Sequence, residues 1–107
     1  MQIQINPGDV EATESLEAHI ENEIRDKLKH IADQVTRIEV HLHDTRGPKH
    51  GVDKRCMIEA RLAGLDPIAV DHDSTQMYDA VEGAAGKLSR AINHKLGKLN
   101  DRRRATQ

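Results

Sequence analysis

Hydrophobic residues recur along this chain with two different periods, which predict strands and helices respectively. Alternation of apolar and polar residues predicts four short strands, at residues 2–5, 37–43, 55–62 and 68–71. Spacings of three and four residues predict two helices, one over about 14–33 and one that ends near residue 100. Thr13 is the predicted N-cap of the first helix. Asp73 or Ser74 is predicted to begin the second helix, with Gln76 completing a capping box.

The order of these elements predicts an α+β fold, a β-α-β-β-β-α two-layer sandwich. A right-handed crossover through the first helix makes the first two strands parallel, and the later strands are expected to continue antiparallel. Each strand has one apolar face, so we expect a four-stranded mixed sheet with the two helices packed on one face and the other face open. Residues 1–100 are predicted to form a single domain and 101–107 a basic, disordered tail.

Composition narrows the functional classes. The chain has no Phe, no Trp and one Tyr, so the core must be aliphatic and a sheet that stacks RNA bases on aromatic rings is excluded. No glycine-rich phosphate loop, zinc-type cysteine pairing or nucleophile elbow occurs, so we predict a protein that is not an enzyme and needs no cofactor or small-molecule substrate. The lone Cys56 is predicted to be a buried structural thiol. One cysteine, no signal peptide and no apolar run of membrane length predict a cytoplasmic protein without a membrane partner.

Charge is distributed unevenly along the chain. From Lys87 onward there are seven basic residues and one acid, a net charge of +6, whereas the preceding 86 residues have nine basic and 17 acidic residues. Five basic residues on the second helix follow one another at spacings of three or four, which places them on one side, away from the apolar stripe. We call this set the basic stripe: Lys87, Arg90, His94, Lys98 and Arg102. Arg103 and Arg104 continue it. A polyanion such as RNA is the favoured partner, and ordinary solvation of a helix end is the alternative.

Three other groups of residues are candidates for chemistry. The loop from Lys49 to Arg55 is a second basic cluster, in which Lys49, Lys54 and Arg55 could reach phosphates. His41 and His43 on one strand, with His50 in the next loop, supply only the beginning of a metal site, so no metal is predicted. Asp71, His72 and Asp73 resemble an acid–base group, but helix capping explains Asp73 better.

Several stretches resemble the ribosome hibernation-promoting factors, also called ribosome-associated inhibitors or sigma-modulation proteins. The resemblance spans nearly the whole chain, and its most specific part begins the second helix. The matching stretches are Met1–Ile5, Val10–Leu16, Met77–Val81, Lys87–Arg90 and His94–Lys95. The resemblance implies the short form of the family, without the additional domain by which longer members pair ribosomes. It also implies that Lys87, Arg90, His94 and Lys95 face RNA, with Lys98 extending the contact.

The sequence and the resemblance together predict a non-enzymatic, ribosome-binding stress or hibernation factor. Its basic helix would contact rRNA of the small subunit, and it would inhibit or protect idle ribosomes. The first alternative is a protein-interaction module that has kept the fold but binds a non-ribosomal partner. The second is a small metal-dependent enzyme built on the three histidines. A monomer or a weak dimer is expected, because an open sheet edge permits pairing without requiring it.

Overall fold

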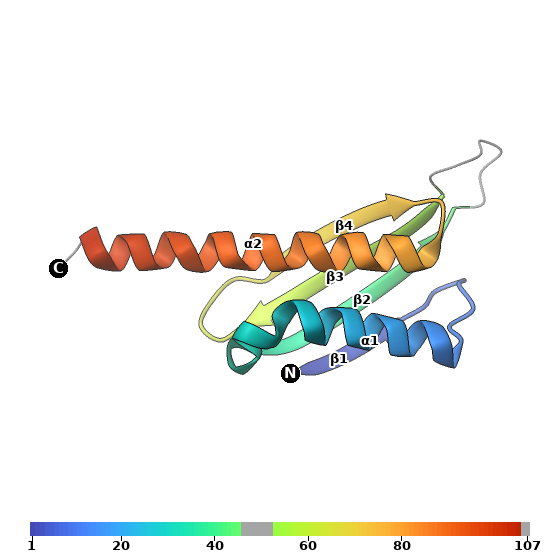
Figure 1. Cartoon of the computed structure of the whole chain (residues 1–107), viewed down its shortest axis with the longest axis horizontal. Helices are drawn as coiled ribbons and strands as arrows, with labels where there is room; N and C mark the ends of the chain where they lie inside the picture. Colours follow the sequence, from blue (N-terminus) through green and yellow to red (C-terminus); the bar gives the residue numbers. More distant parts are fainter. Residues whose placement is uncertain (46–52, 106–107) are drawn as a thin grey trace.

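The alternating segments form one four-stranded sheet in the order β1-β2-β3-β4 (Figure 1). The computed structural model describes residues 1–45 and 53–105, with side chains to residue 100. The strands are β1 (Gln2–Asn6), β2 (Val35–Asp44), β3 (Lys54–Leu62) and β4 (Ile68–Ser74). β1 is parallel to β2, and the other two pairs are antiparallel. The predicted mixed sheet is therefore confirmed.

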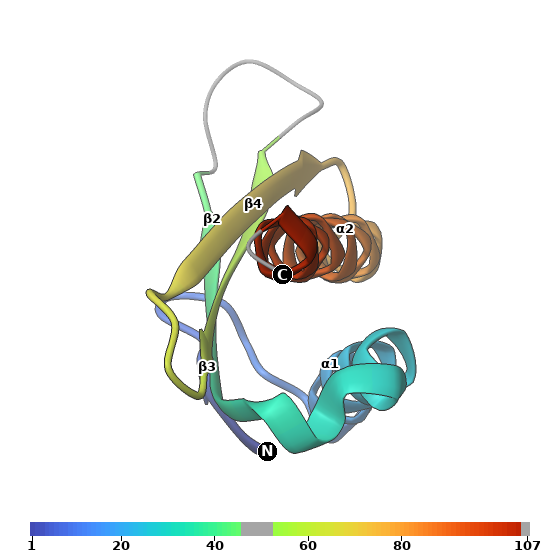
Figure 2. The same cartoon turned by 90° about the vertical axis from the view of Figure 1, so that its left-hand side faces the viewer.

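The two main helices, α1 (Glu14–Leu28) and α2 (Met77–Ala105), lie side by side on one face of the sheet (Figure 2). α1 lies nearer β1, and α2 covers β3 and β4. Aliphatic side chains from both layers meet between them, and Ile20, Ile38, Ile58 and Leu88 are fully buried. The predicted α+β two-layer sandwich with an aliphatic core is confirmed. Among the described residues, no helix is long and apolar enough to cross a membrane.

The first helix starts where the sequence predicts and ends earlier. Thr13 is the N-cap, and its hydroxyl accepts a hydrogen bond of 3.1 Å from the Leu16 N–H. The regular helix stops at Leu28, and a 3₁₀ helix, η1 (Lys29–Gln34), leads into β2. Ile31 leaves the helical conformation within η1 but stays buried. Because Ile31 is buried, it continues the spacing of three or four residues between apolar positions. This explains why the sequence predicts a helix as far as residue 33.

The second helix differs from the prediction at its start. β4 extends to Ser74, and α2 begins at Met77, so the predicted start at Asp73 or Ser74 is wrong. Asp73 lies in the strand opposite Arg55 and forms an ion pair with it at 2.8 Å. The carboxylate is therefore engaged by a cation across the sheet, and the predicted capping box is not formed.

The second helix also continues past its predicted end near residue 100. Its backbone remains helical to Ala105, through residues that the sequence pattern placed in a tail. Arginine favours the helix, and cations near a helix C-terminus are stabilised by the helix dipole. With 29 residues, α2 is about 43 Å long. Its C-terminal part extends beyond the sheet (Figure 1).

Candidate nucleic-acid interface

The described part of the basic stripe lies exposed along α2. Lys87, Arg90, His94 and Lys98 are all exposed, while Leu88 and Ile92 of the same helix are fully buried in the core. Lys95 is exposed too, but it follows His94 directly and so points about 100° away around the helix axis. The described residues of the stripe therefore share one exposed side of the helix, and Lys95 flanks them.

The first two residues of the stripe have defined surroundings. The Lys87 ammonium donates a 3.0 Å hydrogen bond to the backbone carbonyl of Asp71, which joins the stripe to β4. The Arg90 guanidinium lies back along the helix, 3.4 Å from where a Cβ on Gly86 would stand. Gly86 therefore leaves room for Arg90 at the rim of an open groove of about 430 Å³ between α1 and α2.

The Lys and Arg residues of α2 up to residue 100 differ from most other described cations in forming no ion pair with a carboxylate. Six described cations outside α2 each lie 2.8 to 3.7 Å from a carboxylate oxygen: Lys27, Lys29, Arg37, Lys54, Arg55 and Arg61. Arg25 is the one other described Lys or Arg outside α2, and it forms no ion pair with a described side chain. In the part of the chain whose side chains are described, Lys87, Arg90, Lys95 and Lys98 form no ion pair. Their charge is thus available to an anion from outside.

The second basic cluster is largely neutralised within the protein. Lys54 lies 3.0 Å from Asp44 and 3.4 Å from Asp53, and the hydrogen bond to Asp44 raises the pKa of its ammonium. Arg55 binds Asp73, which raises the pKa of the guanidinium and lowers that of the carboxyl. Lys49 lies outside the described residues. The contact of this cluster with RNA stays a prediction, and Lys54 and Arg55 would have to exchange carboxylates for phosphates to make it.

Three polar contacts hold α2 against α1 and the following η1, and so set the position of the basic stripe. The Ser89 hydroxyl donates to the Lys27 carbonyl at 3.3 Å, and the His30 ring nitrogen lies 2.9 Å from the Asn93 side-chain oxygen. The His19 ring nitrogen lies 3.2 Å from the backbone carbonyl of Tyr78. Sequence periodicity did not reveal these contacts, because each joins residues about sixty positions apart.

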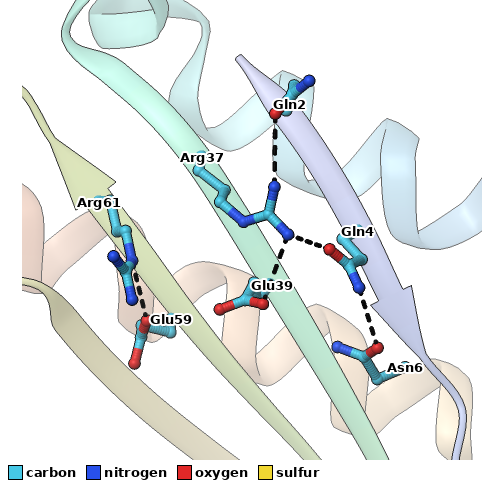
Figure 3. A network of polar contacts seen from close by, with 7 residues as sticks. All are labelled: Gln2, Gln4, Asn6, Arg37, Glu39, Glu59 and Arg61. Atoms are coloured by element: carbon cyan, nitrogen blue, oxygen red, sulfur yellow. Dashed lines mark hydrogen bonds and ion pairs between the residues drawn. The ribbon is translucent and has the colours of Figure 1, made fainter.

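The uncovered face of the sheet carries a network of polar side chains that the sequence pattern did not reveal (Figure 3). The Arg37 guanidinium reaches the side-chain oxygens of Gln2 and Gln4 on β1 and lies 3.6 Å from Glu39. This fork joins β1 to β2 from the open side. Alternating charge along residues 37–39 and 59–61 is the sequence signal that could have indicated it.

The acid–base and metal candidates do not form sites among the described residues. Asp71 and Asp73 lie on the open face of the sheet, whereas His72 lies on the opposite face against Gly83 of α2. His41 and His43 are exposed on the open face, and His50 lies outside the described residues. No group of three or more His, Cys, Asp or Glu residues within the described ranges could hold a metal ion.

Cys56 is fully buried, which confirms its predicted structural role. Burial raises the pKa of its thiol to about 12. At neutral pH the sulfur is therefore protonated and unsuited to nucleophilic chemistry.

Comparison with known proteins adds a family and a fold. Residues 3–100 match the family model described as Sigma 54 modulation protein / S30EA ribosomal protein. A ribosomal subunit interface protein from Coxiella burnetii superposes with a TM-score of 0.76 at 21% identity, covering 91% of this chain and 99% of that one. The N-terminal domain of Thermus thermophilus Protein Y superposes with a TM-score of 0.67 at 18% identity, covering 87% and 93%. A search of curated protein sequences found no match.

Proposed function

The chain belongs to the sigma 54 modulation protein / S30EA ribosomal protein family, whose members are ribosome-associated and are not enzymes; from this membership we propose that it is a hibernation factor. It binds the small ribosomal subunit in the cytoplasm through rRNA and inhibits or protects idle ribosomes. The basic stripe of α2 is the surface that contacts the RNA. Lys95 flanks the stripe, and Arg103 and Arg104 continue it beyond Arg102, since the backbone of α2 remains helical to Ala105.

The observation that carries this proposal is that the cations of α2 whose side chains are described form no ion pair with a carboxylate. A cation that already holds a carboxylate gains less from a phosphate, because it must give up the first partner. Among the described side chains, Lys87, Arg90 and Lys98 form no ion pair that would be lost, and only Lys87 acts on a carboxylate from a longer distance, lowering the pKa of Asp73. Each can release a condensed counterion from RNA, which is the main source of affinity in phosphate binding.

The shape of α2 supports the same surface. Its C-terminal part extends beyond the sheet (Figure 1), so this end of the helix is accessible from more than one side. A helix about 10–12 Å across can lie along an RNA groove or between phosphate strands without requiring the sheet to approach. The acidic body of the protein then stays away from the RNA, which reduces repulsion.

The test is co-sedimentation with ribosomes over a series of salt concentrations. The variant K87Q/R90Q/K98Q removes three cations from the stripe, and R25Q/K29Q/R61Q removes three exposed cations from elsewhere as a matched control. We expect the stripe variant to bind more weakly and to lower the slope of log K against log salt by about 2 to 3. The control variant is expected to keep the slope of the unmodified protein.

Equal slopes for the two variants would refute the assignment of the stripe. Absence of migration with ribosomes even at low salt would refute ribosome binding itself. A binding partner that persists after nuclease treatment would then favour the alternative, a protein-interaction module that uses this fold.

A further inference from the structure

An open groove of about 470 Å³ lies between α1 and β1. Ile3 and Ile5 of β1 and Ala18 of α1 form its apolar part. Three carboxylates of α1 complete the lining: Glu14, Glu17 and Glu21. β1 is at one edge of the sheet and β4 at the other, so this groove lies away from the strand to which the basic stripe is joined.

The strand beside the groove is open to a further strand. β1 pairs with β2 on one side and has no strand partner on the other among the described residues. Ile3 and Ile5 pack against the core but remain partly exposed. On the open face of the sheet Arg37 holds Gln2 and Gln4 (Figure 3), so β1 is fixed in place while its outer edge stays free. An apolar, open edge of this kind is where an extended peptide adds to a sheet.

The charge of the groove selects its occupant. Glu14, Glu17 and Glu21 are exposed at spacings of three and four on one side of α1. None of them forms an ion pair with a described side chain; the acidic side chains of α1 that do so are Glu23 and Asp26, which bind lysines of the same helix region. Three unpaired carboxylates repel RNA and attract cations.

We propose that this groove binds an extended, basic segment of a partner protein, which adds to the free edge of β1 as an additional strand. Side chains on one face of that strand would lie over Ile3 and Ile5. Lysine or arginine fits there, because the aliphatic stem packs on the isoleucines while the charged end reaches Glu17 or Glu21. The proposal adds a protein partner to a molecule whose helix α2 is proposed to bind RNA, and it uses none of the same residues.

The test is titration of the full-length protein with a synthetic peptide of about eight residues in which lysine and threonine alternate, followed by NMR and amide hydrogen exchange. We expect shifts confined to β1 and the groove, and slower exchange of amides in Gln2–Asn6. A peptide alternating glutamate and threonine should not bind. The variant E14Q/E17Q/E21Q should weaken binding by about tenfold, because three exposed charge pairs are lost.

A matched control removes three exposed acids from elsewhere, as D9N/D33N/D66N, and should bind the lysine peptide as the unmodified protein does. Equal weakening by both variants would show attraction to overall charge and overturn the proposal. Shifts centred outside β1 and the groove, or no binding by the lysine peptide, would also overturn it. So would self-association through this edge that excludes the peptide. None of these results bears on ribosome binding, because the stripe is unchanged in every variant.

Discussion

Gly83 is the position where a single methyl group should have the clearest effect on stability. The ring of His72 from β4 packs directly over this glycine of α2. A Cβ added at Gly83 would stand less than 3.0 Å from three atoms of that ring, including Cγ. The overlap therefore involves the base of the imidazole, so the whole ring would have to move.

The magnitude follows from two opposing terms. Replacing glycine by alanine inside a helix stabilises it by about 1 kcal/mol. Forcing an added methyl into a filled space costs about 1–3 kcal/mol. Gly97 of the same helix is a matched control, because it is exposed and nothing lies within 4 Å of its added Cβ. The helix term is common to both substitutions, so G83A should be about 1–3 kcal/mol less stable than G97A.

Urea unfolding monitored by circular dichroism measures the difference, and an unchanged m-value would show that the unfolding reaction is the same. The variant H72A removes the ring, so adding G83A to H72A should stabilise the protein by about 1 kcal/mol, as G97A does. The sign of the G83A effect therefore depends on His72. If G83A stabilised the protein as much as G97A while His72 was present, the packing argument would be wrong.

Three further predictions concern single groups. Cys56 should react with a thiol reagent only after unfolding, because burial raises its pKa to about 12; reaction of the folded protein at the unfolded rate would contradict this. T13A should lower the free energy of unfolding by about 1 kcal/mol through loss of the N-cap, whereas T13S should retain most of it. Asp73 should titrate below its ordinary pKa of 3.8 by NMR, chiefly because Arg55 donates a hydrogen bond to it. A carboxyl whose pKa is lowered in the folded state stabilises the fold at pH values above its unfolded pKa, and this contribution is lost as the pH falls through its folded pKa. R55Q removes the contribution and should therefore reduce the loss of stability on acidification below about pH 4.

The parts of the fold that sequence predicts well are those in which one face is fully buried. Residues 38, 40 and 42 of β2 alternate without exception and are all buried, so a shift of one residue would expose the whole set. The same holds for the stripe of α1 that includes Leu16, Ile20 and Ile24. Burial on one side fixes both the element type and its orientation, which is enough to determine the order of strands and the side that the helices cover.

The ends of the helices depend on interactions that periodicity does not contain. Ile31 fits the apolar spacing of α1 but occupies a 3₁₀ segment, because the chain must turn there to enter β2. Shortly before α2, Asp73 is a residue type that often caps helices, but it lies in strand β4. Which of these applies depends on Arg55, a residue 18 positions earlier that lies opposite Asp73 in the sheet.

That single boundary also affected the predicted site. With Asp73 assigned to a helix cap, Arg55 had no carboxylate opposite it and counted as a free cation in the second basic cluster. Once β4 continues to Ser74, the register places Asp73 beside Arg55 and accounts for its charge. The basic stripe is less affected, because its described residues lie on the exposed side of a helix and Lys87 alone reaches a strand, where its hydrogen bond goes to a backbone carbonyl of β4. A count of charge along the chain treats these two groups of cations alike. The distinction between a cation held by the fold and one available to an anion requires the strand register. This distinction favours α2 over Lys54 and Arg55 as the proposed RNA-binding surface.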